Sequence, residues 1–252
     1  MRLALVLLTF LVFTPTLGGV VVVASLLGIP DRPDGVYDRM ARLWTRLLCA
    51  AAGVHVVLHD AHRMTVGNAR VFAANHVSWY DVFVLASVLP FHKFVAKAEL
   101  FRIPIFGRAA RAVGTIPIER ENRKAAFTAY DEAAGRIRGG SSVIVFPEGT
   151  RGSDYPLRPF KKGPFVLAIA AQAPIVPTIV HGTISVQARG SWRIRPGRVD
   201  VHFLEPVPTA GLGYEDRDQV SREVWNRMAS AQETLYGVRS IGAPARQAVA
   251  AH

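Results

Sequence analysis

The chain consists of short hydrophobic and polar runs, and the period of each run predicts an element. Strand-like runs lie at 54–60, 69–76, 91–96, 115–119, 141–147 and 174–180. Helical runs lie at 81–90, 123–140, 163–173 and 216–237, with broken helices over 99–114 and a hairpin expected over 192–206. Strands that alternate with helices predict an α/β domain with a mixed, largely parallel sheet flanked by helices.

The first 29 residues carry a different pattern. No charged residue lies between Leu3 and Ile29, and a helix of that length exceeds the roughly 30 Å of a bilayer's hydrocarbon core. Pro15, Gly18 and Gly19 interrupt the run, so the segment could span the membrane or kink and re-enter the same leaflet. A cleaved signal peptide is the alternative interpretation.

Residues 37–54 read as an amphipathic helix. One predicted face is apolar and the other is basic; the apolar residues are Met40, Leu43, Leu47 and Leu48, with Trp44 beside them, and the basic ones are Arg39, Arg42 and Arg46. A basic amphipathic helix suits the surface of an anionic bilayer, although a helix packed on the protein core fits the pattern equally well. We therefore expect an N-terminal membrane-embedded helix pair over 1–53, an α/β domain over 54–237 and a disordered tail over 238–252.

Composition supports contact with lipid. Of the 252 residues, 50% are hydrophobic, the mean hydropathy is +0.22 and the formal net charge is +11. A basic chain binds anions such as nucleic acid, anionic membrane or phosphorylated substrates. Only one cysteine, Cys49, is present, which excludes an internal disulfide and a cysteine-rich metal site. Excess arginine after the first apolar run favours a cytoplasmic main body.

The stretch NHVSWYD, at 75–81, carries the first candidate chemistry. An imidazole oriented by a carboxylate acts as a general base, and His76 and Asp81 are five residues apart across a predicted strand-to-helix turn. His55 and Asp60 have the same spacing, but an offset of five within a strand places them on opposite faces. We therefore assign the base to His76 rather than His55.

The stretch VFPEGTRGS, at 145–153, follows the most strand-like run of the chain. Glu148, Gly149, Thr150 and Arg151 leave that strand through a tight turn, where glycine permits close backbone approach and arginine can bind a phosphate bidentately. Other cations at element ends are Lys97, Arg120 in GTIPIER, and the pair Lys161 and Lys162. Each could be an ordinary solvated charge, but their recurrence at element ends indicates an anion site.

The order NHVSWYD, GTIPIER, FPEGTRGS, IVPTIV resembles the four sequence blocks of the glycerolipid acyltransferases. The 1-acylglycerol-3-phosphate (lysophosphatidic acid) acyltransferase branch is the most similar, over roughly residues 70 to 180. By this resemblance His76 is the general base and Asp81 its partner. Substrate binding falls, by the same resemblance and the turn chemistry above, to Lys97, Arg120, Glu148, Gly149, Thr150 and Arg151.

The resemblance implies an enzyme of phospholipid biosynthesis that moves a fatty acyl group to the free hydroxyl of 1-acylglycerol-3-phosphate, giving phosphatidic acid. The donor is acyl-CoA or acyl carrier protein as co-substrate, and no cofactor or metal is expected. The expected partners are membrane lipid and the acyl donor, without nucleic acid or an obligate protein partner, at the cytoplasmic face of the cell membrane. Direct transfer is expected, because Ser78 lies outside any G-x-S-x-G elbow.

Two other functions fit parts of the pattern. A lipid hydrolase would use the same His76 and Asp81 to activate water, so only the products distinguish it from an acyltransferase. A non-enzymatic basic protein bound to anionic membrane or nucleic acid would instead carry its cations in a continuous stripe, without a paired His–Asp site.

Overall fold

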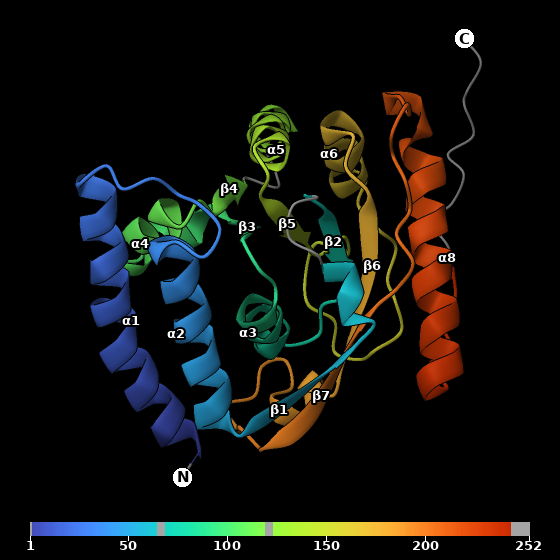
Figure 1. Cartoon of the computed structure of the whole chain (residues 1–252). Helices are drawn as coiled ribbons and strands as arrows, with labels where there is room; N and C mark the ends of the chain where they lie inside the picture. The colour runs from blue at the N-terminus through green and yellow to red at the C-terminus, as the bar shows by residue number, and fades with distance from the viewer. Residues whose placement is uncertain (1, 65–68, 119–122, 243–252) are drawn as a thin grey trace.

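A seven-stranded sheet forms the centre of the protein, whose computed structural model describes residues 2–64, 69–118 and 123–242 (Figure 1). The strand order is β1-β7-β6-β2-β5-β3-β4. The strands are β1 (Val54–His59), β2 (Val71–Ala74), β3 (His92–Lys97), β4 (Ile116–Ile118), β5 (Ser142–Val145), β6 (Ile175–His181) and β7 (Gly197–Phe203).

All neighbouring strands pair in parallel except β6 and β7. Strands β1 and β7 consequently run opposite to the other five. The predicted α/β domain with a mixed, largely parallel sheet is therefore confirmed. In such sheets functional side chains lie at the carboxyl ends of the parallel strands. Functional residues are therefore expected at the ends of the central strands β2, β5 and β6.

Alternate residues of the central strands fill two separate cores. Val71 and Ala73 face one layer, and Phe72 and Ala74 face the other, as the two-residue period of a strand requires. The first layer contains α5 (Arg123–Arg138), α6 (Gly163–Ala171) and α8 (Arg217–Tyr236); the second contains α2 (Val36–Ala52) and α3 (Trp79–Val88). Both faces of β2 and β5 are thus covered, which explains their uninterrupted apolar sequences.

The first helix, α1 (Arg2–Leu26), packs beside α2 and α4 (Phe106–Ala112). Trp44 of α2 joins the three helices: its indole nitrogen donates to Thr14 Oγ1 at 3.0 Å, and its ring lies 6.1 Å from the rings of Phe10 and Phe106. Among the described residues, α1 alone is long and apolar enough to cross a membrane, by length and composition. It is a continuous helix through Pro15.

The burial of α2 differs in detail from the predicted faces. Leu43, predicted on the apolar face, is 41% exposed, whereas Asp38 and Thr45 are buried. Helix α2 packs against α1 and α3, so part of its surface fits the alternative of a helix packed on protein. The predicted hairpin over 192–206 is wrong: only β7 forms, because its partners are β6 and the distant β1.

Candidate active site

His76 and Asp81 meet at the carboxyl end of β2, where the chain turns into α3. His76 Nδ1 lies 2.9 Å from Asp81 Oδ2. Ser78 caps the helix, and Asp81 occupies the third helical position, where its carboxylate completes a capping box. The same Oδ2 accepts hydrogen bonds from the backbone N–H groups of Val77 and Ser78, at 2.6 and 2.7 Å. These donors suit an ionised carboxylate that holds the imidazole in one tautomer.

The imidazole of His76 is fixed from several directions. Its ring stacks on Phe146 with centroids 4.0 Å apart and planes 19° apart. Its backbone N–H donates to Glu148 Oε1 at 2.9 Å, and its carbonyl accepts from Gly152 N at 2.7 Å. The turn after β2 is thereby bound to the loop after β5. With Nδ1 on Asp81, Nε2 is the nitrogen that can accept a proton from a substrate.

Ser78 lies beside this pair but is engaged in capping. Its hydroxyl donates to the carbonyl of Gln187 at 2.7 Å and accepts from Tyr80 N at 3.2 Å, and the residue is fully buried. A hydroxyl with both functions occupied inside the protein is poorly arranged to attack an acyl group. The geometry therefore supports the expectation that no acyl-serine forms.

Glu148 holds the turn that carries His76 through a hydrogen bond to the backbone of that turn. This residue is buried, and burial raises the pKa of its carboxyl above the usual range, while hydrogen bonds from His76 N and from Arg158 oppose the rise. Arg158 Nε donates to Glu148 Oε2 at 3.0 Å and its guanidinium also reaches the carbonyl of Thr150. Both carboxylate oxygens therefore contact protein. Arg158 lies outside the four sequence blocks, so no local pattern indicates its role.

Arg151 lies on the loop after β5, close to Trp79 and Asp81. Its guanidinium sits over the ring of Trp79, 4.4 Å from the centroid, and Arg189 donates to its carbonyl at 2.7 Å. Burial lowers the pKa of Arg151, the nearby Arg189 lowers it further, and Asp81 opposes the shift. Two guanidinium groups close together, beside a proton acceptor, form a surface suited to an anionic substrate.

The remaining predicted binding residues are distributed around this centre. Gly149 has a φ of 76°, a conformation that favours glycine, and Thr150 is exposed beside it. Lys97 ends β3, is 59% exposed at its side chain and pairs with Glu99 at 2.9 Å. No contact of Lys97 with His76 or Arg151 is seen. Arg120 lies outside the described residues, as do 243–252 of the predicted tail.

Asn75 attaches the turn to the sheet. Its side-chain amide donates to the carbonyl of Val180 at 3.0 Å, and its side-chain oxygen accepts from Val180 N at 2.8 Å. Asn75 is fully buried. The side chain thus continues the pairing of β2 with β6 by one step beyond the last backbone pair, Ala74 with Thr178. This contact spans 105 residues, and no local signal indicates it.

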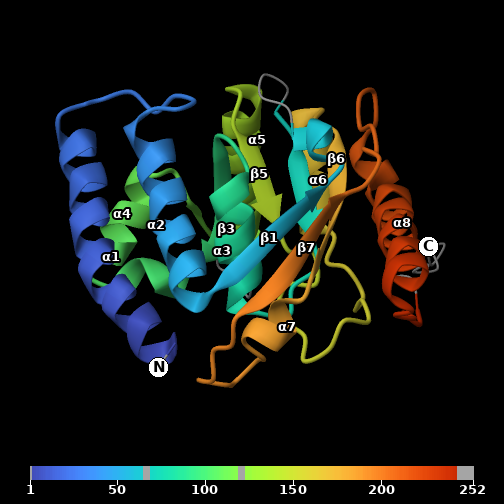
Figure 2. The ribbon, with the colours of Figure 1, turned by 60° about the horizontal axis from the view of Figure 1, so that its bottom comes forward.

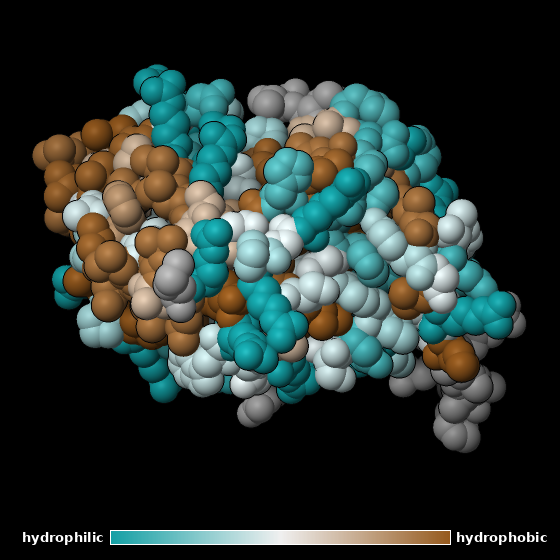
Figure 3. Space-filling model, turned by 90° about the horizontal axis from the view of Figure 1, so that it is seen from below, coloured by the Kyte–Doolittle hydropathy of each residue, from teal (hydrophilic) through white to brown (hydrophobic). Residues whose placement is uncertain are grey.

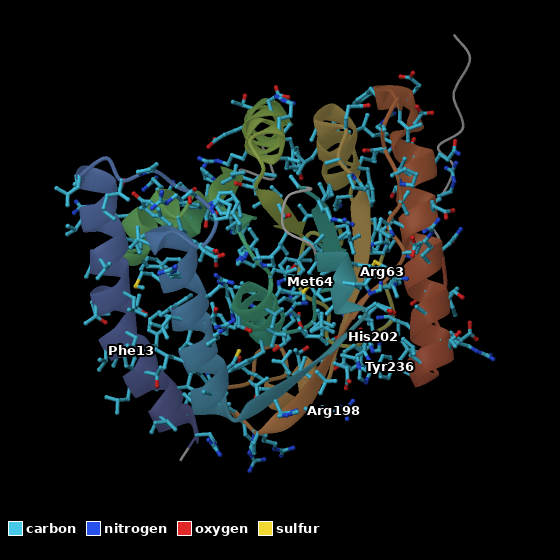
Figure 4. The ribbon with its side chains drawn as sticks, viewed as in Figure 1. Phe13, Arg63, Met64, Arg198, His202 and Tyr236 are labelled. Atoms are coloured by element: carbon cyan, nitrogen blue, oxygen red, sulfur yellow. The ribbon has the colours of Figure 1, made fainter. Side chains whose placement is uncertain are left out.

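The second sequence pair with the same spacing does not form a comparable site. Asp60 lies 3.5 Å from Arg63, and His55, at the start of β1, is exposed. A different pair was missed: His59 Nε2 lies 2.7 Å from Asp200 Oδ1, and His59 stacks on His202 at 4.0 Å. Figure 4 shows His202 beside Tyr236, whose hydroxyl is 2.6 Å from His202 Nε2.

That second cluster is partly buried, with His202 buried and His59 and Asp200 partly exposed, and Arg198 neutralises its carboxylate. Arg198 makes two hydrogen bonds from Nε, at 3.2 and 3.0 Å, to the oxygens of Asp200. The imidazole planes of His59 and His202 differ by only 6°, so one ion cannot lie in both ring planes without rotation of a ring. A metal centre is not favoured at these three residues.

Comparison with known proteins agrees with this geometry. The family model described as Acyltransferase matches residues 55–181. The chain is 34% identical over 178 residues to 1-acyl-sn-glycerol-3-phosphate acyltransferase alpha of Ovis aries, covering 70% of this chain and 62% of that protein. It is 36% identical over 138 residues to the chloroplastic 1-acyl-sn-glycerol-3-phosphate acyltransferase BAT2 of Brassica napus, covering 54% of this chain and 40% of that protein.

A solved structure extends the similarity to nearly the whole chain. The crystal structure of the 1-acyl-sn-glycerophosphate (LPA) acyltransferase PlsC from Thermotoga maritima superposes with a TM-score of 0.73 at 26% identity. The match covers 92% of this chain and 98% of that one. The regions matched by this chain span only 40% of the Brassica protein and 62% of the Ovis protein.

Proposed function

Because this chain belongs to the acyltransferase family, we propose that it transfers a fatty acyl group to the free hydroxyl of 1-acylglycerol-3-phosphate, giving phosphatidic acid. The observation that carries the proposal is the contact of His76 Nδ1 with the buried Asp81 carboxylate at 2.9 Å, at the end of a central strand. Acyl-CoA or acyl carrier protein supplies the acyl group as a thioester, and no other cofactor takes part.

In the proposed reaction His76 Nε2 takes the proton of the acceptor hydroxyl as its oxygen attacks the thioester carbonyl. The tetrahedral intermediate then collapses, the carbon–sulfur bond breaks, and the departing thiolate takes the proton from the imidazolium. Asp81 stabilises the imidazolium that forms between these two steps. No covalent acyl-enzyme is required, in keeping with the capping role of the Ser78 hydroxyl.

We assign the acceptor's phosphate to Arg151, because it lies over Trp79 and within electrostatic reach of Asp81. By the family resemblance we also assign Lys97, Arg120, Gly149 and Thr150 to acceptor binding. Glu148 acts through the turn that it holds rather than by contact, since a carboxylate repels a phosphate and both its oxygens already contact protein.

The membrane is the proposed location, with α1 and α2 as the embedded pair and the α/β domain on the cytoplasmic face. Large apolar side chains of α1 are exposed, among them Leu7, Leu8, Leu11, Val23 and Leu26. Figure 3 shows apolar residues gathered over the N-terminal side of the molecule. Arg39 and Arg46 are exposed on α2, where they can contact anionic headgroups.

A panel of lysolipids incubated with one labelled acyl-CoA tests the proposed function. We expect labelled phosphatidic acid from 1-acylglycerol-3-phosphate, with less product from lysophosphatidylglycerol and lyso-ornithine lipid. The same panel with acyl carrier protein thioester identifies the donor. Labelled free fatty acid as the main product would mean a hydrolase, and no turnover with any acceptor would contradict the proposal.

A further inference from the structure

The Asp81 carboxylate is held by two parts of the chain that are far apart in sequence. Its Oδ2 takes three hydrogen bonds from its own turn, including the one from His76. Its Oδ1 accepts from the hydroxyl of Thr183 at 2.6 Å, across 102 residues of sequence. Asp81 and Thr183 are both fully buried. Thr183 begins the short helix α7 (Thr183–Val186) that follows β6.

We propose that Thr183 is a positioning residue for the His76–Asp81 pair, an inference that rests on the proposed function. Three donors restrain Oδ2, and the Thr183 hydroxyl is the donor to the other oxygen, Oδ1. Holding both oxygens limits rotation about the Cβ–Cγ bond more tightly than donors on Oδ2 alone, and so keeps Oδ2 directed at His76. Loss of the Thr183 donor would leave Oδ1 buried without a hydrogen bond, which costs free energy and removes one restraint on the carboxylate.

The turn that carries Thr183 is itself braced. Gly182 has a φ of 102°, and a Cβ there would lie 2.2 Å from the carbonyl oxygen of Arg198, so only glycine fits. The hydroxyl of Tyr155 accepts from Gly182 N at 2.8 Å and from Ile184 N at 3.3 Å. Tyr155 also stacks on His181, with centroids 4.2 Å apart.

The far end of α7 is attached to the catalytic turn as well. Ser78 Oγ donates to the carbonyl of Gln187, which follows α7 directly. Figure 2 shows α7 and the loop after β5, which carries Tyr155 and Arg151, together at one end of the sheet. One short helix therefore touches the His–Asp turn at both of its ends, through Thr183 and Gln187.

Three charged or titratable groups that face this pair come from one loop, the one after β5. Arg151 and Tyr155, on the loop after β5, both interact electrostatically with Asp81. Glu148, on the same loop, bonds the backbone of His76. None of them replaces a donor at Oδ1. The Thr183 hydroxyl is therefore the donor at Oδ1 that a substitution can remove selectively.

Thr183→Val, Thr183→Ser and Thr178→Val test the proposal, each as full-length protein with the wild type beside it. Valine keeps the shape of threonine and removes only the hydroxyl, while serine keeps the hydroxyl. Thr178 is the matched control, because it is also fully buried and its hydroxyl donates only to the carbonyl of Val176, at 3.1 Å. Should Thr183→Val not fold, Thr183→Ala against Thr178→Ala gives the same comparison.

We expect Thr183→Val to lower kcat by about ten- to a hundredfold, the range for one hydrogen bond to a charged group. The acceptor KM should stay within about twofold, because Thr183 contacts Asp81 and not the proposed acceptor site. Thr183→Ser should recover most of kcat, and Thr178→Val should resemble the wild type. A wild-type kcat in Thr183→Val, or a loss of kcat that serine does not recover, would overturn the proposal.

A measurement without substrate separates this proposal from the proposed function. In proton NMR the Nδ1–H of an imidazole bonded to a carboxylate gives a far-downfield signal, which His76→Gln should remove. Thr183→Val should shift or broaden that signal, and Thr178→Val should leave it in place. An unchanged signal in Thr183→Val would refute the positioning role, whichever reaction the protein catalyses.

Discussion

Asn75→Ala should destabilise the whole domain, because the Asn75 side chain occupies a step of the sheet. Its amide and oxygen pair with both backbone groups of Val180, at 3.0 and 2.8 Å, in a fully buried position. Alanine removes both partners and leaves a buried N–H and a buried C=O unsatisfied. The turn that carries His76 loses its attachment to β6 at the same time.

The expected cost follows from those two groups. Each buried backbone group without a partner costs about 1–3 kcal/mol, so the sum is about 2–6 kcal/mol before relaxation. Domain stability is about 5–15 kcal/mol, and 1 kcal/mol shifts the midpoint of a domain of this size by about 2–4 °C. We therefore expect a fall in Tm on the order of 5–20 °C, with a lower kcat for the molecules that stay folded.

Thermal unfolding in detergent micelles, followed by circular dichroism, measures the effect. The matched control is Asn226→Ala: Asn226 is exposed on α8, and its loss should change stability by less than about 0.5 kcal/mol. An Asn75→Ala protein that melts within about 2 °C of the wild type would refute the reasoning. It would mean that Val180 finds other partners and that the turn does not depend on this side chain.

Three further predictions concern binding, pH and location. Arg151→Ala should raise the acceptor KM by about ten- to a hundredfold, with little change in the thioester KM, because a charge-assisted contact is lost. The control Arg193→Ala, at an exposed loop position, should leave the acceptor KM unchanged. Equal acceptor KM values for the two variants would remove Arg151 from the site. The hydrogen bond from Arg198 lowers the pKa of Asp200 to about 2, so the stability that this group contributes is present above about pH 4 and is lost as pH falls toward 2. Because Arg198 is exposed, that contribution should be about 1 kcal/mol or below. Asp200→Asn should flatten this part of a curve of stability against pH, and an unchanged slope would contradict the lowered pKa of Asp200. A high-salt wash should leave the protein in the membrane fraction, since apolar burial of α1 is not screened as surface charge is; recovery of intact protein in the wash would contradict the anchor.

Local patterns predict most of the fold. The apolar periods locate the strands of the sheet and the helices α3, α5, α6 and α8 to within a few residues, and the α/β class follows from their alternation. The resemblance to the glycerolipid acyltransferases is confirmed by the family model and by the relatives that carry the name of that branch. The element assignments rest on periods within each run, and the resemblance rests on four short blocks and their order, all of which a single sequence displays.

Non-local contacts account for what the sequence does not reveal. Residues 192–206 contain the turn formers Pro196 and Gly197, yet β7 pairs with β1, more than 130 residues earlier, instead of folding back on itself. The helix α1 continues through Pro15, because an isolated proline costs one hydrogen bond that packing against neighbouring helices can offset. Neither outcome can be read from the pattern around those residues.

In the site, too, residues joined by local contacts can be predicted from the sequence and residues joined by non-local contacts cannot. His76 and Asp81 are recognisable because the turn that joins them is only five residues long, and a strand followed by a helix brings them together. Thr183 and Val180 reach the same turn from more than one hundred residues away. The partnership of Glu148 with Arg158 crosses a loop without periodicity. Supporting residues of this kind require the three-dimensional arrangement.

The role of His76 as general base is the central claim, and single-turnover acyl transfer by His76→Ala tests it most directly. We expect a rate lower by about two to four orders of magnitude, in a protein that still folds and stays in the membrane. Asp81→Asn should be similarly impaired, while His55→Ala should retain transfer. Ser78→Ala loses the cap and the bond to Gln187, so it should lower transfer far less than His76→Ala does. An active His76→Ala protein, or an acyl group trapped on Ser78, would contradict the account.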